Sequence, residues 1–470
     1  DHIAQLLDPM AADSEALAHL SEIPFANPSE ARRRLLFLAH GEPPMRLPEN
    51  VQALFVQFLP ALLGCVQRMP DPDAALRSFE RMVSRAGGRE LAYQFFLDHP
   101  TVLEVMCRVG GYSEYLSGIL VDHPEFLDRM VLASYARRDP TLDDLMAEVG
   151  ERIRPLRRLE LRLDDLRRFR RREAFRIGVR DLLGVIDTEQ TIAGLSDLAE
   201  ACLRLLSDEI QASLPGADQL RVAILGLGKL GGRELHYSSD LDVLFVYEPV
   251  GLDDEMSLVQ RWASQVTRAA DELTRAGRLY PLDARLRPFG SSSPLVRTLE
   301  SYQAYWRQHA EPWERLALTR CRPVAGDDEL GRRFVDCAAA FVYGDPPDEA
   351  AMDSLRGIKR RIETERLDTA DTAHLDLKLE PGGIMDIEYL TQVLQIAAGS
   401  AHPSVRGANT PQAIAALGQA GVLTSAEADL LSRNYWQFRR TELRLQLIAE
   451  QPSGRLPLDA DGLSAAALRL

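Results

Sequence analysis

Two aspartates one residue apart are the clearest candidates for chemistry in this sequence. Asp240 and Asp242 stand at the start of the apolar run LDVLFVY. Residues two apart on a strand share a face, so both carboxylates would point one way while Leu241 and Val243 face the core. Neighbouring carboxylates repel each other unless a cation lies between them. Because Mg²⁺ commonly binds one or two carboxylates together with substrate phosphates, the pair predicts a metal site.

A second charged cluster follows in the segment RLYPLDARLR, which begins at Arg278 and is expected to form a further strand. On such a strand Asp283, Arg285 and Arg287 would share one face. Guanidinium groups bind phosphate oxygens through paired hydrogen bonds. The segment therefore adds a third carboxylate and two phosphate-binding arginines.

A glycine-rich turn, GLGKLGG, precedes the aspartates and fits the dinucleotide fingerprint G-x-G-x-x-G. That fold needs a helix of about three turns before its next strand, whereas only GRELHYSS separates Gly231 from Asp240. A P-loop is excluded too, because the spacing before Lys229 is wrong. We interpret the turn as a place where nucleotide phosphates approach the backbone. Its candidate phosphate-binding residues are Gly228, Lys229, Gly231, Gly232 and Ser239.

Together these parts predict a phosphoryl- or nucleotidyl-transfer site with three acids for two metals and arginines for triphosphate charge. The alternative is that Asp240 and Asp242 only cap a strand and that the arginines are surface residues. The glycine turn and the third acid, which a lone D-x-D would lack, favour the transferase.

The elements that must position these residues are expected in the order helix, strand, glycine-rich turn, strand, helix, strand. Residues 1–187 show helical patterns separated by proline-containing breaks, and residues 331–470 are again helical. We therefore expect an α+β, predominantly helical protein. Its expected domains are a helical region at 1–187, a nucleotidyltransferase domain at 188–330 and a C-terminal helical bundle at 331–470.

An arginine-dense stretch, LRRLELRLDDLRRFRRREAFRIGVR, runs from Leu156 to Arg180. It could bind anions or dock a partner. We favour the alternative, a solvated helix whose arginines pair with nearby acids such as Glu160 and Glu173.

Composition restricts the classes of protein that this chain can belong to. Its 470 residues suffice for about three domains, and a formal net charge of −15 argues against a general nucleic-acid binder. No run of about 18 uncharged apolar residues occurs, which argues against a membrane span. The five cysteines are scattered, as expected for reduced thiols in a cytoplasmic protein. The chain begins at Asp1 and stops within AAALRL, so we expect a piece of a longer polypeptide.

Four segments, in order, resemble one family of enzymes. They are GLGKLGGRELHYSSDLDVLFVY, LYPLDARLRPFGSSSPLV, WERLALTRCRPVAGD and LDLKLEPGGIMDIEYLTQVLQ. From about Arg81 nearly to its end, the sequence is similar to bacterial glutamine-synthetase adenylyltransferases. The resemblance implies a DNA polymerase β-like nucleotidyltransferase domain flanked by helical domains.

The resemblance also implies roles for single residues. The family's metal-binding acids fall on Asp240, Asp242 and Asp283, which would hold Mg²⁺ at a two-metal site with ATP as substrate. Its nucleotide turn falls on residues 228–232, and its DxRLRP arginines on Arg285 and Arg287. Its K-x-x-x-GGI-x-DIE motif falls on Lys378, Gly382, Gly383, Asp386 and Glu388, of which Lys378 is expected at the phosphates. His236, where many members carry Asn or Gly, is expected to be no ligand.

Family members are two-headed, multifunctional enzymes of nitrogen regulation. One half attaches AMP to a tyrosine of glutamine synthetase, and the homologous half removes it by phosphorolysis to give ADP. Helices upstream of the glycine turn resemble the segment joining the halves, which favours the C-terminal, AMP-attaching half; the deadenylylating half is the alternative. A vestigial regulatory scaffold is a third hypothesis. Expected partners are glutamine synthetase as substrate and, as regulators, PII signalling protein and glutamine, with no nucleic acid or membrane partner.

Overall fold

The computed structural model describes residues 2–42, 45–85, 87–126, 139–365, 373–448 and 454–468. Its helices are α1 (His2–Leu6), α2 (Asp13–Ala18), α3 (Pro28–His40), α4 (Glu49–Val66), α5 (Pro72–Arg85), α6 (Arg89–Asp98), α7 (Pro100–Tyr112), α8 (Glu114–Asp122), α10 (Leu142–Ile153), α11 (Leu159–Leu182), α12 (Thr188–Ser213), α13 (Gly228–Gly231), α14 (Glu255–Asp271), α15 (Leu299–Gln308), α16 (Pro312–Leu318), α17 (Asp328–Tyr343), α18 (Glu349–Glu365), α19 (Ile384–Ala398), α20 (Thr410–Gln419), α21 (Ser425–Ile448) and α22 (Ala460–Ala467). Its strands are β1 (Gly41–Glu42), β2 (Met45–Arg46), β3 (Arg221–Gly226), β4 (Leu241–Glu248), β5 (Leu282–Asp283), β6 (Val296–Thr298), β7 (Arg322–Gly326), β8 (His374–Asp376) and β9 (Arg455–Pro457). The expected α+β, predominantly helical class is confirmed.

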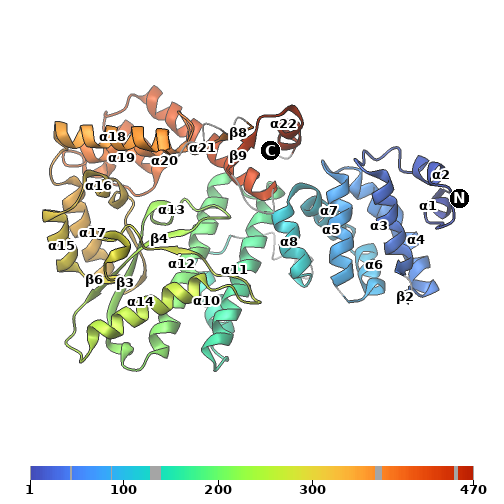
Figure 1. Ribbon diagram of the computed structural model, residues 1–470, viewed down its shortest axis with the longest axis horizontal. Coiled ribbons are helices and arrows are strands. Elements are labelled where there is room, and N and C mark those ends of the chain that lie inside the picture. Colours follow the sequence, from blue (N-terminus) through green and yellow to red (C-terminus); the bar gives the residue numbers. More distant parts are fainter. Residues whose placement is uncertain are drawn as a thin grey trace.

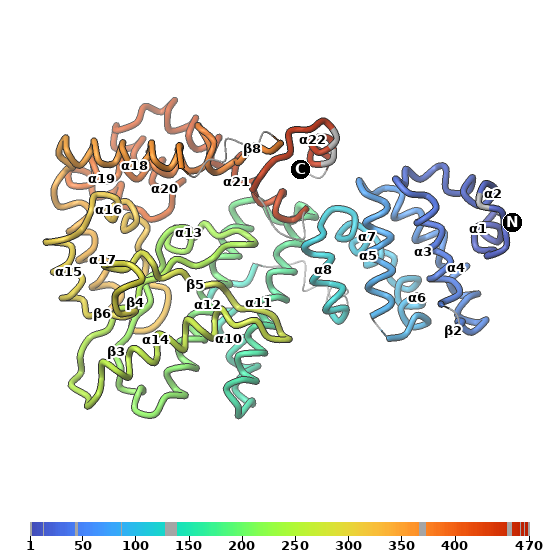
Figure 2. Tube along the Cα trace, in the orientation of Figure 1, coloured from blue at the N-terminus to red at the C-terminus, as the bar shows by residue number. Residues whose placement is uncertain are grey.

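Helices α1–α8 form an array at one end of the molecule (Figure 1), and the same path can be followed in the trace of Figure 2. Aromatic side chains of α4, α5 and α6 fill its centre; the Phe58 ring, for example, stacks on Phe79 and Tyr93. Among the described residues, one helix, α4, is by its length and composition long and apolar enough to cross a membrane. Its buried side chains, including Phe55 and Leu62, belong to the core of this array.

A five-stranded sheet lies at the other end of the molecule. Its order is β5-β4-β3-β7, with β6 also pairing with β4. Strand β3 is antiparallel to β4 and β7, while β5 and β6 run parallel to β4. Strand β5 therefore extends the sheet at the start of β4 and β6 at its end, with α14 in the connection between β4 and β5.

Alternation along β3 and β4 divides the core between the two faces of the sheet. One face of the sheet packs against α12 and α14, and the other face packs against α15, α16 and α17. Leu241 and Val243 are fully buried on the α12–α14 face, as predicted. By the same alternation Asp242 points to the opposite face, where Leu244 contributes to the second cluster.

The expected strand from Arg278 is wrong over most of its length. Strand β5 covers only Leu282–Asp283, after which the chain turns. The Asp283 side chain accepts a hydrogen bond from the backbone N–H of Arg285 (2.8 Å). Such a local bond favours a turn over continued strand pairing. The two arginines consequently do not share a strand face with Asp283.

The arginine-dense segment forms α11, and its arginines do pair with local acids. The expected solvated helix is nevertheless wrong for four of these arginines, because Arg167, Arg172, Arg176 and Arg180 are buried. Arg172 and Arg176, for example, bond the two oxygens of buried Glu173 at 2.9 and 2.7 Å.

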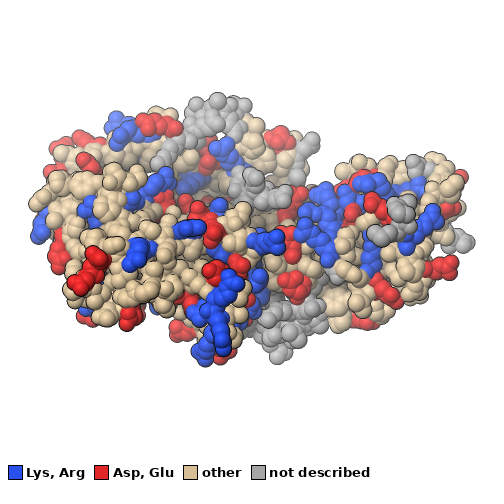
Figure 3. All heavy atoms as spheres, turned by 60° about the horizontal axis from the view of Figure 1, so that its bottom comes forward, with Lys and Arg blue, Asp and Glu red and all other residues tan. Residues whose placement is uncertain are grey.

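On the surface of the molecule, the face in Figure 3 carries basic and acidic side chains interspersed, with a gathering of basic side chains at its lower centre.

The C-terminal helices cover the glycine turn. Helix α21 packs on α19 and α20 and reaches back to α12 and α8. Its buried face includes charged residues, among them Arg439 and Glu442. These contacts bring residues far apart in sequence to the strand ends that carry the aspartates.

Candidate functional site

The D-x-D aspartates and the glycine turn meet at the start of β4. The backbone N–H of Leu227, at the end of β3, donates to the carbonyl of Asp242 (2.9 Å). Gly228 follows with a φ of +52°, and a Cβ there would lie 2.4 Å from Asp242 Oδ2. Glycine therefore lets the turn approach this carboxylate without backbone strain and without displacing the Asp242 side chain.

Asp283 lies beside Asp242 because β5 pairs with β4 in register, residue for residue. Burial, followed by the charges of Asp240 and Asp283, raises the pKa of Asp242 to about 6. The charges of Lys378 and Arg285 oppose that rise. Asp240, Asp242 and Asp283, called the carboxylate edge below, thus repel one another, as the sequence predicts for acids that lack a cation.

The two predicted phosphate-binding arginines have protein partners. Arg285 Nε lies 2.9 Å from Asp283 Oδ2, and its hydrogen bonds hold the pKa of Asp283 below its usual range. The Arg285 side chain is 79% exposed, so this pair can open at small cost. Arg287 instead donates to the backbone carbonyls of Ala284 (2.7 Å) and Ser293 (3.2 Å), which orders its loop.

Residues 228–232, the glycine turn, present different residues to different sides. Gly228 and Lys229 line a cavity with the carboxylates, whereas Gly231 and Gly232 line another hollow, bounded by α12, α20 and α21. A Cβ on Gly231 would collide with the carbonyl oxygen of Arg320 at 1.7 Å. Gly231 therefore allows the turn to pack against the backbone of Arg320, two residues beyond the end of α16.

The cavity beside the carboxylates, called the site cavity below, has a volume of about 600 Å³. That volume lies within the usual range for small-molecule sites, about 300–1,000 Å³. Its polar lining is Gly228, Lys229, His236, Ser239, Asp240, Asp242, Arg320, Lys378, Glu388 and Gln392. Its apolar lining is Leu286, Trp313, Leu316, Ile358, Ile362, Met385 and Tyr389.

The sequence did not predict that most of the apolar residues of this lining belong to the site. It comes from α16, α18 and α19, more than 70 residues after the aspartates. Met385, Glu388, Tyr389 and Gln392 recur at intervals of three and four residues, so they form one stripe along α19. That periodicity is visible in the sequence, but it equally fits an ordinary core face.

Mg²⁺ fits the donor set of the carboxylate edge. All three acids supply oxygen, and their mutual repulsion is what a divalent cation would relieve. Within the described part of the chain, however, no group of three His, Cys, Asp or Glu side chains converges closely enough to hold an ion. Asp283 is turned toward Arg285, so the third ligand requires that pair to open.

A buried charge network lies behind the glycine turn; its members are Lys229, Glu234, Arg320, Glu388, Arg439 and Glu442. Lys229 Nζ lies 3.0 Å from Glu442 Oε1, and Arg439 Nε lies 3.2 Å from Glu442 Oε2. Burial lowers the pKa of Lys229 to about 8. Burial opposes ionisation of Glu442, but the charges of Lys229 and Arg439 hold its pKa well below its usual range.

The rest of the network connects this pair to the wall of the site cavity. Arg439 Nη2 donates to the carbonyl of Glu234 (2.7 Å), and the Tyr435 hydroxyl donates to Glu234 Oε2 (2.9 Å). Arg320 Nη1 lies 3.3 Å from Glu234 Oε2 and 3.4 Å from Glu388 Oε1. The network therefore bonds α19 and α21 to the segment that follows the glycine turn.

His236 also lies in this region, as part of the cavity wall. Its Nε2 is 3.8 Å from Glu442 Oε1, and Ser239 Oγ accepts a hydrogen bond from its backbone N–H (3.0 Å). Burial, with the charge of Lys229, lowers the pKa of His236 well below its usual value. A neutral imidazole beside an ammonium does not compete for Glu442 as a cation.

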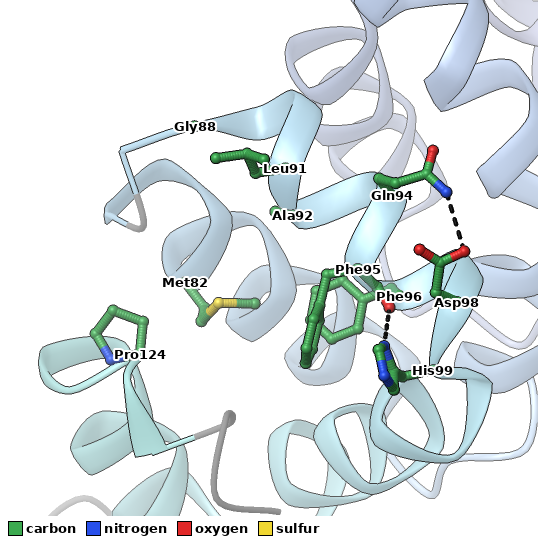
Figure 4. Close-up of a pocket in the computed structure, with 10 residues that line it drawn as sticks. All are labelled: Met82, Gly88, Leu91, Ala92, Gln94, Phe95, Phe96, Asp98, His99 and Pro124. Atoms are coloured by element: carbon green, nitrogen blue, oxygen red, sulfur yellow. Dashed lines mark hydrogen bonds between the residues drawn. The ribbon is translucent and has the colours of Figure 1, made fainter. Parts of the chain in front are cut away.

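A cavity of about 420 Å³ in the N-terminal array differs in chemistry (Figure 4). Phe95 and Phe96 lie beside Met82, and His99 Nδ1 is 2.9 Å from the carbonyl oxygen of Phe95. Asp98 is the one acid among the described residues of its lining, and it accepts a hydrogen bond from Gln94 (3.0 Å). This largely apolar hollow has no counterpart to the carboxylate edge.

Two family models match the chain. Residues 103–337 match glutamate-ammonia ligase adenylyltransferase, and residues 356–470 match GlnD PII-uridylyltransferase. Among curated proteins, the chain is similar to bifunctional glutamine synthetase adenylyltransferase/adenylyl-removing enzymes. It is 32% identical to that of Mycobacterium leprae strain TN over 95% of this chain and 46% of the relative, and 35% identical to that of Mycobacterium tuberculosis strain H37Rv over 93% and 46%. The chain thus spans about half the length of the curated relatives it matches.

Proposed function

We propose that this chain, which belongs to the glutamate-ammonia ligase adenylyltransferase family, transfers AMP from ATP to a tyrosine of glutamine synthetase. Because the chain spans about half of its relatives, their activity does not pass to it without a test.

The in-register pairing of Asp242 with Asp283, beside Gly228, is the observation that carries the proposal. It brings Asp283 beside Asp242, which is 41 positions away in the sequence and lines the site cavity. A backbone turn without a side chain at Gly228 leaves room for phosphates beside acids that suit a cation.

We propose that Mg²⁺ would be held by Asp240, Asp242 and Asp283, two ions being the expected number. Bound there, the metal would offset the charge of the triphosphate and stabilise the charge that develops during transfer.

The other residues of the site cavity would bind and orient ATP. Lys378 lies near enough to the carboxylate edge to lower the pKa of Asp242, and its ammonium suits phosphate oxygens. Trp313, Ile358 and Tyr389 offer an apolar wall for the base. Gly231, Gly232 and Arg287 would act indirectly, by shaping the turn and the loop, and Ser239 by fixing the turn that leads into Asp240.

We further propose that the nucleotidyltransferase unit at 188–330 is completed by the helices of 331–470. Helices α18 and α19, which line the site cavity, lie beyond residue 330. The N-terminal region 1–187 would then serve regulation or docking, with PII protein and glutamine as proposed regulators of the longer, cytoplasmic enzyme.

The proposed reaction could run in either of two directions, attachment or removal of AMP. The sequence upstream of the glycine turn favours the AMP-attaching half over the half that removes AMP by phosphorolysis. Intact-mass measurement of glutamine synthetase incubated with the chain, ATP and Mg²⁺ tests this. Gain of one AMP per subunit is expected. Loss of AMP from pre-modified enzyme, dependent on phosphate and yielding ADP, would reverse the assignment, and no change in either assay would overturn the function.

A further inference from the structure

Lysine is scarce in this chain, and all three lysines lie at or beside the site cavity. The sequence has lysine only at positions 229, 359 and 378, among 55 basic residues. Lys229 and Lys378 line the cavity, and Lys359 stands between Ile358 and Ile362, the α18 residues that line it. In a chain that otherwise uses arginine, these are the positions where a compact ammonium is retained over a planar guanidinium.

Carboxylates of the C-terminal helices hold two of these lysines. Lys359 pairs with Asp386, which joins α18 to the start of α19. Lys229 pairs with Glu442 of α21, 213 positions away. The latter pair is almost wholly enclosed, with side-chain exposures of 13% and 5%.

Several further contacts fasten α21 to the glycine turn. Arg439, which is fully buried, forms an ion pair with Glu442 and donates a hydrogen bond to the carbonyl of Glu234. The backbone N–H of Glu234 in turn donates to the carbonyl of Lys229 (2.8 Å). The Lys229 side chain and backbone are therefore both held through residues that contact α21.

We propose that Glu442 is a positioning residue, which holds the Lys229 ammonium and the glycine turn in the geometry used for nucleotidyl transfer. This proposal rests on the proposed function, since it concerns the same nucleotide. Glu442 is not in the lining of the site cavity, so it acts through Lys229 rather than on the nucleotide. Held by Glu442, Lys229 is restrained before ATP arrives, and Lys378, which also lines the cavity, would meet the phosphates.

Glu442→Gln tests the proposal, because it keeps the shape of the side chain and removes its charge. Asp429→Asn is the matched control, an acid-to-amide change at an exposed position of the same helix. In the AMP-transfer assay Glu442→Gln is expected to lower kcat on the order of 10- to 100-fold. The KM for ATP should rise less than about threefold, because the interaction acts in the transition state more than in binding.

Companion variants separate positioning from simple structure. Glu442→Asp, which keeps the charge, should recover part of the lost kcat, whereas Lys229→Arg should not replace lysine. The double variant Lys229→Met/Glu442→Gln should lose no more activity than Lys229→Met alone. Multiplied losses would show independent roles and overturn the proposal.

A readout other than activity keeps the proposal separate from the proposed function. With ¹³Cε-lysine labelling the chain gives only three lysine ε-methylene NMR signals, one per lysine. The Lys229 signal should shift in Glu442→Gln and stay unchanged in Asp429→Asn. If the wild type transfers no AMP, the proposed function fails while this spectrum still tests the pair. An unshifted Lys229 signal, or an unchanged kcat, would overturn the positioning role. Should Glu442→Gln not fold, Glu442→Asp carries the same measurements.

Discussion

At the carboxylate edge, Asp240, Asp242 and Asp283 bring like charges together at a surface that solvent reaches. A few residues away, in the buried charge network, opposite charges such as those of Lys229 and Glu442 are enclosed and paired. The edge gathers charge of one sign, which a cation would offset, whereas the network pairs opposite charges within the protein. We therefore expect substitutions at the edge to affect activity more than stability, and substitutions in the network to affect stability more strongly.

Asp242→Asn should separate the two regions most widely. We expect AMP transfer to fall on the order of a thousandfold, because the central acid of the edge is lost. The thermal unfolding midpoint should stay the same or rise, since the substitution removes repulsion. Activity above a few per cent of wild type would contradict the metal assignment.

Arg320→Met, in the buried charge network, should lower the stability of the protein strongly. Arg320 is buried between Glu234 and Glu388, so its loss leaves both acids without that partner. We expect about 3–5 kcal/mol less stability in denaturant unfolding of the whole chain. Arg332→Met, at an exposed position of α17, is the control and should change stability little. Equal losses of stability in Arg320→Met and Arg332→Met would contradict the structural role that we assign to the network.

Gly228→Ala probes the point where the two regions touch. Its φ is +52°, and the added Cβ would meet Asp242 Oδ2 at 2.4 Å. Gly421→Ala is the matched control, since Gly421 also has a positive φ (+72°) but open space around it. Both should lose about 1–2 kcal/mol of stability from backbone strain. Only Gly228→Ala should also lose AMP transfer, by about tenfold or more; a similar loss in Gly421→Ala would assign the effect to stability.

Magnesium should give the smallest effect and the most specific one. At ten times its Kd, an ion that binds only the folded protein adds about 1.4 kcal/mol of stability. The thermal midpoint of the wild type should therefore rise with Mg²⁺, and that of Asp242→Asn should not. The same rise in both proteins would place the ion away from the carboxylate edge.

The two regions also differ in how far the sequence predicts them. The alternation around Asp242 correctly places Leu241 and Val243 in the core, because a strand's period of two is a local property. The strand expected through Arg285 fails because a side-chain hydrogen bond of Asp283 turns the chain, a choice between two local patterns that composition does not decide.

The network was beyond prediction for a different reason. Glu442 meets Lys229 across 213 positions, and a glutamate in a long amphipathic helix has no feature that marks it as buried. The α19 stripe that lines the site cavity has the same ambiguity. Only tertiary packing distinguishes such residues from an ordinary helix face.

The scarcity of lysine has a practical consequence for mapping complexes of this protein. The side-chain amines of this sequence are at only three positions, all at or beside one cavity, and that of Lys229 is enclosed by its pair with Glu442. A cross-link from Lys359 or Lys378 to another protein would therefore place that protein within cross-linker reach of the cavity. Labelling that fades as nucleotide is added would measure its occupancy directly.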